Sequence, residues 1–174
     1  MFGEYRGFPL DTTNLDRPRV SVCIPNLNCR EFLPERFDSI LNQSFECIEI
    51  IVVDGFSGEG SWEYIKARAA EDRRIKCLQK SPKGIYDGIN SCIALARGEF
   101  IYIATADDSM AENFFEAMCF GLNECPSAGI AHAPLRVLDA SSISVEKWWS
   151  TDSIFAKSSG GFIRKRHLRY APFD

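Results

Sequence analysis

The feature that most constrains the fold is a repeated switch between short apolar runs and segments with helical spacing. The apolar runs are Val20 to Ile24, Ile48 to Val53, Ile75 to Leu78 and Phe100 to Ala104. Continuous runs of this length, rich in β-branched residues, are typical of strands that are buried on both faces. Strands of that kind occur in parallel sheets, so we predict a mostly parallel sheet that contains these four strands.

Helical segments follow the predicted strands. Their apolar stripes consist of Leu33, Phe37, Ile40, Leu41 and Phe45, then Trp62, Ile65 and Ala69, then Ile85, Ile89, Cys92, Ile93 and Ala96, and last Phe114, Phe115, Met118 and Leu122. Gly98 is expected to end the third helix at its C′ position, where a left-handed backbone is favoured. Pro126 is expected to end the fourth. This alternation predicts an α/β fold with helices on both faces of the sheet.

Composition excludes several classes of protein. The 174 residues, 45% of them hydrophobic, suffice for one domain with a core. A net charge of -4 provides no broad basic surface, so we expect no nucleic-acid partner. The seven cysteines show no C-x-x-C spacing, and we expect reduced core residues in the cytoplasm rather than a zinc site. No stretch has the pattern of a signal peptide or of a membrane span.

Polar residues gather where three of the predicted strands end. The first strand runs into Pro25, Asn26 and Asn28, the second into Asp54 and Gly55, and the fourth into Thr105, Ala106, Asp107 and Asp108. Parallel strands bring their carboxyl ends to one edge of the sheet, where open α/β sheets bind ligands. The adjacent Asp107 and Asp108 repel each other unless a cation compensates them. Such oxygen ligands suit Mg²⁺ or Mn²⁺ completed by substrate phosphates, which predicts a metal-bound diphosphate.

Each of these signals also has a purely structural explanation. Asp108 with Ser109 could cap the following helix. Asp54 and Gly55 could form an ordinary turn, and asparagine side chains often close loops through Asx turns. Trp148 and Trp149 could form a sugar platform or pack under a loop. The basic run from Arg164 to His167 could be a solvated strand edge or a contact for a phosphate group.

Four blocks of the sequence together resemble the family 2 glycosyltransferases. The blocks are VSVCIPNLN, IEIIVVDGFSGEGSWE, KGIYDGINSCIALARGEFIYIATADDSM and GGFIRKRHLRYAPFD. The resemblance covers about residues 19 to 174 and leaves residues 1 to 18 as an N-terminal extension. It implies a GT-A fold, which is Rossmann-like, and a nucleotide-diphosphate sugar as the donor substrate.

The resemblance also implies roles for particular residues. The nucleotide-sugar site would comprise Pro25, Asn26, Asn28, Asp54, Gly84, Tyr86, Asp87, Asn90, Ala106, Asp107 and Asp108. Within this set Asp54 would accept a hydrogen bond from a base N–H, and Tyr86, Asp87 and Asn90 would line the donor pocket. Asp107 and Asp108 would fall on the D-x-D motif and hold the divalent metal.

The sequence departs from the family pattern in three places. Gly55 stands where the family commonly has a second aspartate, and Thr105 stands where the first aspartate of D-x-D is common. The family's acidic general base lies beyond APFD, and this chain stops at Asp174. We therefore expect either a fragment or a protein without the acceptor half. No base is assigned among the remaining candidates, which are His132, Asp139, Asp152, His167 and Asp174. His132 is expected to be a partly buried histidine with its hydrogen bonds satisfied rather than a catalytic residue.

The resulting prediction is a metal-dependent, inverting glycosyltransferase. It would transfer sugar from a nucleotide-diphosphate sugar, expected to be a UDP-sugar, to a glycan, polysaccharide or lipid-linked acceptor. The alternative is a non-catalytic nucleotide-sugar-binding module that lacks the base. A nucleotidyltransferase would share the sheet and the metal, but it usually has a glycine-rich, lysine-containing loop after the first strand, and PNLNCREF is not such a loop.

Overall fold

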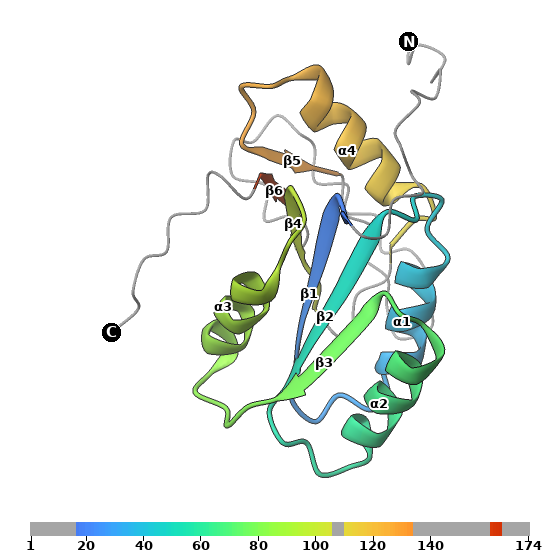
Figure 1. Ribbon diagram of the computed structural model, residues 1–174, viewed down its shortest axis with the longest axis vertical. Coiled ribbons are helices and arrows are strands. Elements are labelled where there is room, and N and C mark those ends of the chain that lie inside the picture. The colour runs from blue at the N-terminus through green and yellow to red at the C-terminus, as the bar shows by residue number, and fades with distance from the viewer. Residues whose placement is uncertain (1–16, 106–109, 134–160, 165–174) are drawn as a thin grey trace, which may run out of the picture.

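The computed structural model describes residues 17–105, 110–133 and 161–164. The elements in chain order are β1 (Val20–Asn26), α1 (Leu33–Leu41), β2 (Ile48–Asp54), α2 (Ser61–Glu71), β3 (Ile75–Gln79), α3 (Ile85–Leu95), β4 (Phe100–Ile103), α4 (Phe114–Glu124), β5 (Ile130–His132) and β6 (Gly161–Arg164). All four predicted strands and all four predicted helices are present (Figure 1). Their local apolar patterns were sufficient to place them.

The strands form one sheet in the order β3-β2-β1-β4-β6-β5. β1 pairs in parallel with β2 and β4, and β2 pairs in parallel with β3. β6 pairs antiparallel with both β4 and β5. The prediction of a mostly parallel α/β sheet is therefore confirmed, with an antiparallel extension on one side.

One expectation near that extension is wrong, and another stays a prediction. Arg164 ends β6, which lies between β4 and β5, and residues 165–167 lie outside the described residues, so the role of the basic run as a strand edge or a phosphate contact stays a prediction. His132 was expected to be partly buried, but it is exposed because β5 is the outermost strand of the sheet. Both strands are short, and sequence periodicity says nothing about the partner that a three- or four-residue strand will pair with.

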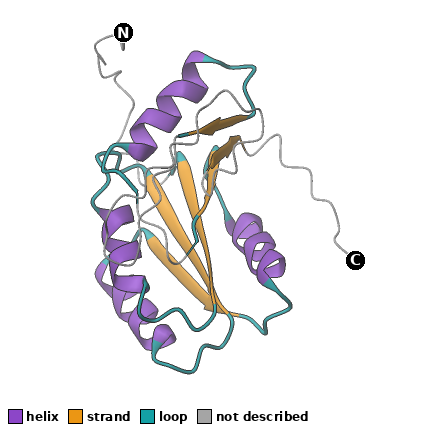
Figure 2. Ribbon diagram, turned by 180° about the vertical axis from the view of Figure 1, so that it is seen from behind, coloured by secondary structure: helices purple, strands orange, loops and turns teal. Residues whose placement is uncertain are grey.

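Helices cover both faces of the sheet, as predicted (Figures 1 and 2). On one face, α1, α2 and α4 bury residues such as Phe37, Ile65 and Phe115 against alternate residues of the strands. On the other face, α3 packs Cys92 and Ile93 against the intervening strand residues. Because both faces are covered, β1 and β2 are buried along nearly their whole length.

Gly98 has a different role from the one predicted. The helix before it ends at Leu95, and Ala96 leaves it with an extended backbone, so Gly98 is not at the C′ position. A Cβ atom at residue 98 would lie 2.7 Å from the backbone nitrogen of Ser21. Glycine is needed here because the chain passes directly against β1, and this contact is not local in sequence.

A buried carboxylate links several strands at the end of the sheet that lies opposite the predicted ligand edge. Glu49 on β2 is 2% exposed and accepts hydrogen bonds from Ser21 Oγ at 2.7 Å and Lys76 Nζ at 2.8 Å. It also accepts from the backbone nitrogen and the Nε of Arg97 at 2.6 and 3.1 Å. Burial would raise the pKa of Glu49, but these partners lower it to about 2. Glu49 is therefore ionised and holds β1, β3 and the start of β4 together.

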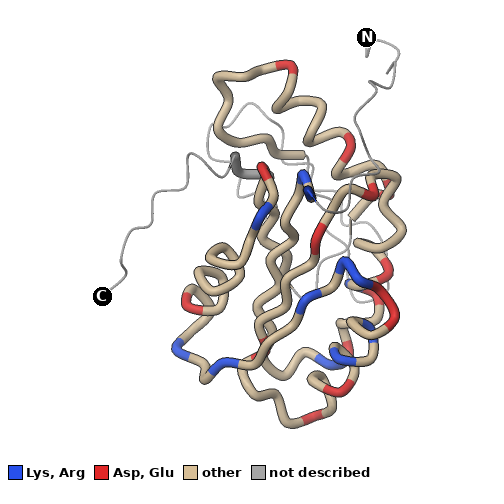
Figure 3. Tube along the Cα trace, in the orientation of Figure 1, with Lys and Arg blue, Asp and Glu red and all other residues tan. Residues whose placement is uncertain are grey.

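The cysteines and the charges agree with the composition. All seven cysteines are free, and Cys23, Cys47, Cys92 and Cys119 are buried as small core residues. Figure 3 shows that acidic and basic residues are interspersed along the described chain. None of the helices in the described ranges combines the length and apolarity that a membrane span requires.

Candidate functional site

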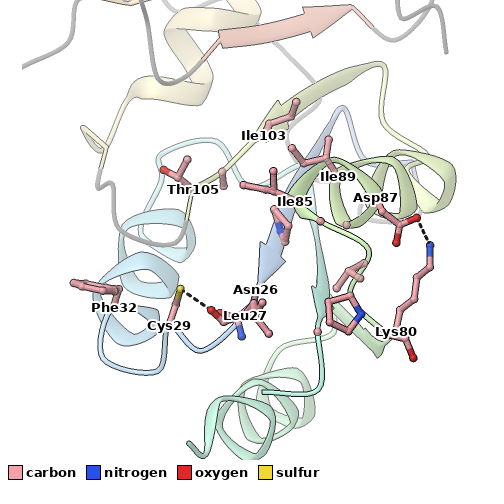
Figure 4. A pocket seen from close by; sticks show the side chains of 18 residues that line it. Asn26, Leu27, Cys29, Phe32, Lys80, Ile85, Asp87, Ile89, Ile103 and Thr105 are labelled. Carbon is pink, nitrogen blue, oxygen red and sulfur yellow. Dashed lines mark hydrogen bonds and ion pairs between the residues drawn. The ribbon is translucent and has the colours of Figure 1, made fainter. Parts of the chain in front are cut away.

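A cavity of about 410 Å³ lies at the carboxyl ends of the parallel strands, beside the first turns of α3 (Figure 4). Its lining comes from the ends of four strands, from the loops that follow the first three, and from α3. The lining residues are Pro25, Asn26, Leu27, Cys29, Phe32, Val53, Gly55, Lys80, Ser81, Pro82, Gly84, Ile85, Asp87, Gly88, Ile89, Ile103, Ala104 and Thr105. This is the edge at which the sequence placed a ligand.

The cavity wall is mostly apolar. Leu27 and Phe32 on one side and Ile85 on the other are large side chains that remain 51%, 44% and 60% exposed. Figure 4 shows that Leu27 and Phe32 come from the segment after β1, whereas Ile85 and Ile89 come from α3. Apolar walls with a few polar groups are typical of small-molecule sites, and they suit the faces of a ring system.

Helix α3 reaches the cavity closely because it carries a glycine. A Cβ atom at Gly88 would lie 3.0 Å from the Cβ of Pro25, so a larger residue would push α3 away from the end of β1. Gly84 precedes the helix with a φ of 99°, a conformation that favours glycine. These two glycines allow α3 to begin directly over the strand ends.

Asp54 lies next to the cavity as the centre of a hydrogen-bond network. Its Oδ1 accepts from Asn26 Nδ2 at 2.8 Å and from Ser57 Oγ at 2.7 Å. Its Oδ2 accepts from the Ser57 backbone nitrogen at 3.1 Å and from Gln79 Nε2 at 2.9 Å. Burial would raise the pKa of Asp54, but the hydrogen bonds from Gln79, Ser57 and Asn26 lower it. The fully buried Asp54 is thus an ionised structural hub that links β1, β2 and β3.

The same network joins the loops after β1 and β2. The backbone nitrogen of Asn28 donates to Ser57 Oγ at 2.9 Å, and Asn28 Oδ1 accepts from the backbone nitrogen of Gly58 at 3.2 Å. Asn28 and Phe56 have φ values of 54° and 60°, and such left-handed backbone is strained for phenylalanine. The predicted loop-closing role of Asn28 takes the form of a bridge between two loops.

Lys80 and Asp87 form an ion pair on the cavity wall, at 2.8 Å between Lys80 Nζ and Asp87 Oδ1 (Figure 4). Lys80 Nζ also donates to Ser91 Oγ at 2.9 Å. Neither Lys80 nor Ser57 is among the predicted site residues. Lys80 follows β3 directly, and its position at the end of a parallel strand is the signal that could have identified it.

The predicted site residues divide into four groups. Pro25, Asn26, Gly84 and Asp87 line the cavity, together with Gly55 and Thr105. Asn28 and Asp54 do not line the cavity but support it through the loop network. Tyr86 and Asn90 lie on α3 outside the lining, and Tyr86 is 62% exposed. Ala106, Asp107 and Asp108 lie outside the described residues. The binding roles of all these residues stay predictions.

No metal centre is found in the described ranges, and the general base stays unassigned. No three His, Cys, Asp or Glu side chains there lie close enough together to hold a metal ion. The predicted ligands Asp107 and Asp108 fall in the undescribed segment 106–109. Of the unassigned bases, His132 is in β5, whereas Asp139, Asp152, His167 and Asp174 lie outside the described residues, as do Trp148 and Trp149.

Comparison with known proteins identifies the family. The profile described as "Glycosyl transferase family 2" matches residues 21–168, which is most of the chain. The chain belongs to glycosyl transferase family 2. Glycosyltransferase GlyG of Streptococcus pneumoniae is 36% identical over 100 residues, which is 57% of this chain and 33% of that protein. The match thus spans about a third of the length of this relative.

Solved structures show the same fold. The mannosyltransferase PcManGT from Pyrobaculum calidifontis, in complex with GDP-Man and Mn²⁺, superimposes with a TM-score of 0.62 and 24% identity, covering 70% of this chain and 36% of that one. Residues 1–349 of S. aureus TarS, in complex with UDP-GlcNAc, superimpose with a TM-score of 0.59 and 21% identity. This match covers 64% of this chain and 33% of that one. The predicted GT-A, Rossmann-like fold is therefore confirmed.

Proposed function

We propose that this chain is the donor-binding part of an inverting glycosyltransferase that depends on a divalent metal. It would bind a nucleotide-diphosphate sugar and transfer the sugar to a glycan, polysaccharide or lipid-linked acceptor. The observation that carries the proposal is the position of the cavity: it lies beyond β1, β2 and β4, and Thr105, which lines it, comes shortly before Asp107 and Asp108 in the sequence.

Two solved relatives support this choice of donor. The mannosyltransferase was solved with GDP-Man and Mn²⁺, and TarS with UDP-GlcNAc. Both ligands combine a nucleobase with a diphosphate. The apolar walls near Leu27 and Ile85 suit the base, and the aspartates near Thr105 suit a cation that carries the diphosphate.

The chemistry assigns separate tasks to the two ends of the cavity. Displacement at the anomeric carbon requires stabilisation of the leaving diphosphate, which a bound Mg²⁺ or Mn²⁺ supplies. Asp107 and Asp108 would hold that ion. The α3 side of the cavity orients the nucleoside, and the Lys80–Asp87 ion pair fixes the first turns of α3 in place. Direct displacement from the opposite face would invert the configuration of the sugar.

The second candidate is a binding module without transfer activity. Asp87 is the one Asp, Glu or His among the described residues that line the cavity, and it is already paired with Lys80. A general base contributes about 10² to 10⁴-fold to such reactions. Without one, the donor would bind while transfer stayed slow.

Calorimetry with UDP and GDP, with and without Mn²⁺, tests the proposal. We expect one of these nucleotides to bind markedly more tightly when Mn²⁺ is present. The double variant Asp107→Asn, Asp108→Asn should lose this metal dependence because its amides cannot provide the negative charge. The variant Asp38→Asn, which alters an exposed aspartate on α1 (side chain 65% exposed), is the control and should bind like the wild type. Metal-dependent binding that survives in the double variant would refute the metal assignment.

The release of nucleoside diphosphate from the UDP- or GDP-sugar separates the enzyme from the module. Acceptor-dependent release by this chain, or by a longer form of the protein, establishes a transferase. Tight donor binding with no release by either form favours the binding module.

A further inference from the structure

Residues 73–97 are an exception to the mixed charge of the chain. This segment contains six Lys or Arg residues and one acidic residue, a net charge of +5, whereas the whole chain carries -4. It forms β3, the loop after β3 and α3, and Figure 3 shows basic residues at intervals along β3 and that loop. Because β3 is the outermost strand on its side of the sheet, we call the six basic residues the basic edge. They are Arg73, Arg74, Lys76, Lys80, Lys83 and Arg97.

Two cations of the basic edge share one buried carboxylate. Glu49 Oε2 lies 2.8 Å from Lys76 Nζ and 3.1 Å from Arg97 Nε. The Glu49 side chain is 3% exposed, whereas those of Lys76 and Arg97 are 45% and 51% exposed. One negative charge therefore lies beneath two positive charges, and only the cations face the solvent.

The other ion pairs of the basic edge leave it positive as well. Asp72 pairs with Arg74 at 2.7 Å, and Asp87 pairs with Lys80 at 2.8 Å. Together with Glu49, three carboxylates accompany six cations, so the basic edge keeps an excess charge of +3. A local excess of this kind attracts an anionic surface, even though the chain as a whole is acidic.

Exposed apolar side chains accompany these cations. Ile85 and Tyr86 at the start of α3 are 60% and 62% exposed, and Leu95 at its end is 46% exposed. Among the described helices, α3 lies by itself on its face of the sheet (Figures 1 and 2). Lys and Arg beside exposed apolar and aromatic residues are typical of helices that lie on a bilayer surface. A soluble polyanion would gain nothing from the apolar groups.

We propose that the basic edge and the exposed residues of α3 form a peripheral docking surface for a lipid bilayer with anionic headgroups. The cations contact lipid phosphates, and apolar side chains such as Leu95 enter the boundary between headgroups and acyl chains. The cavity lies beside the first turns of α3, so docking brings it close to the lipid surface. Docking is independent of the proposed function, because vesicle binding requires no nucleotide.

Sedimentation with lipid vesicles tests the proposal. The vesicles consist of phosphatidylcholine alone or of phosphatidylcholine mixed with phosphatidylglycerol. We expect binding to the anionic vesicles to be about tenfold or more tighter than to the neutral ones. The difference should vanish at about 1 M salt, where the Debye length falls to about 3 Å. Equal binding to both kinds of vesicle, or binding to neither, would overturn the proposal.

The variant Arg73→Gln, Lys83→Gln removes two charges without breaking an ion pair among the described residues, and both side chains belong to exposed residues. It should bind anionic vesicles about tenfold or more weakly than the wild type. The matched control is Asn113→Asp, Asn123→Asp, which lowers the net charge by the same two units at the two ends of α4. The control should bind like the wild type. An equal loss in both variants would mean that only net charge matters, which contradicts a localised surface.

Two further measurements separate the bilayer from other occupants. Leu95→Ser should bind anionic vesicles about threefold more weakly, because it loses an apolar group that enters the bilayer, but it should bind heparin, a soluble polyanion, like the wild type. Unchanged vesicle binding by Leu95→Ser would make the surface a polyanion site and refute the bilayer assignment. Sedimentation equilibrium without lipid should show no dimer that the Arg73→Gln, Lys83→Gln variant dissociates. Such a dimer would make the basic edge a contact between copies of the chain and would also overturn the proposal.

Discussion

The buried Glu49 permits a stability prediction whose size follows from the structure. Its pKa is lowered from an ordinary 4.5 to about 2, although burial alone would raise it, because Lys76, Ser21 and Arg97 hydrogen-bond to the carboxylate. Each pKa unit corresponds to about 1.4 kcal/mol, so ionised Glu49 contributes about 3 kcal/mol to folding. A lowered native pKa means that this stability is complete above the unfolded pKa of about 4.5 and is lost as the pH falls toward 2.

The variant Glu49→Gln removes the charge and keeps the shape. At pH 7 we expect its free energy of unfolding to be about 3 kcal/mol lower than that of the wild type. The difference should shrink between pH 4.5 and pH 2, where wild-type Glu49 becomes protonated. Urea unfolding followed by tryptophan fluorescence at several pH values measures this.

The control for this prediction is Glu99→Gln. Glu99 pairs with Arg19 at 3.0 Å, but its side chain is 46% exposed, and exposed ion pairs contribute less than about 1 kcal/mol. A Glu49→Gln difference that is the same at pH 7 and pH 3 would refute the electrostatic reasoning, because a packing defect does not depend on protonation.

Two further predictions concern the network beside the cavity. Asp54→Ala should lower the free energy of unfolding by about 3 kcal/mol or more, because it leaves the buried donor of Asn26 and the partly buried donors of Ser57 and Gln79 without their acceptor. Unchanged urea unfolding together with weakened UDP binding would instead make Asp54 a direct ligand of the base. The free energy of unfolding of Phe56→Gly should be about 1 kcal/mol higher than that of Phe56→Ala in the same assay, because only glycine is relaxed at a φ of 60°. Equal free energies of unfolding would show that the backbone at residue 56 is not strained.

The sequence alone determined the elements and the edge at which they converge. Apolar runs and helical stripes are local patterns, and they located β1 to β4 and α1 to α4 to within a few residues. Parallel pairing follows from strands that are apolar on both faces, and it brings the residues after β1, β2 and β4 to one edge. Family resemblance then pointed to the same edge as a nucleotide-sugar site.

The tertiary structure decided which of these residues line the cavity. Asp54 and Gly55 are neighbours in the sequence, yet the alternation of the strand and the placement of α3 put the aspartate in a buried network and the glycine in the cavity wall. Gly98 was assigned to a helix end by a local rule, but it is required by contact with Ser21, 77 residues earlier. The position of β6 between β4 and β5 likewise depends on pairing between distant segments. Local periodicity carries no information about such contacts, because they depend on how separate elements pack in space.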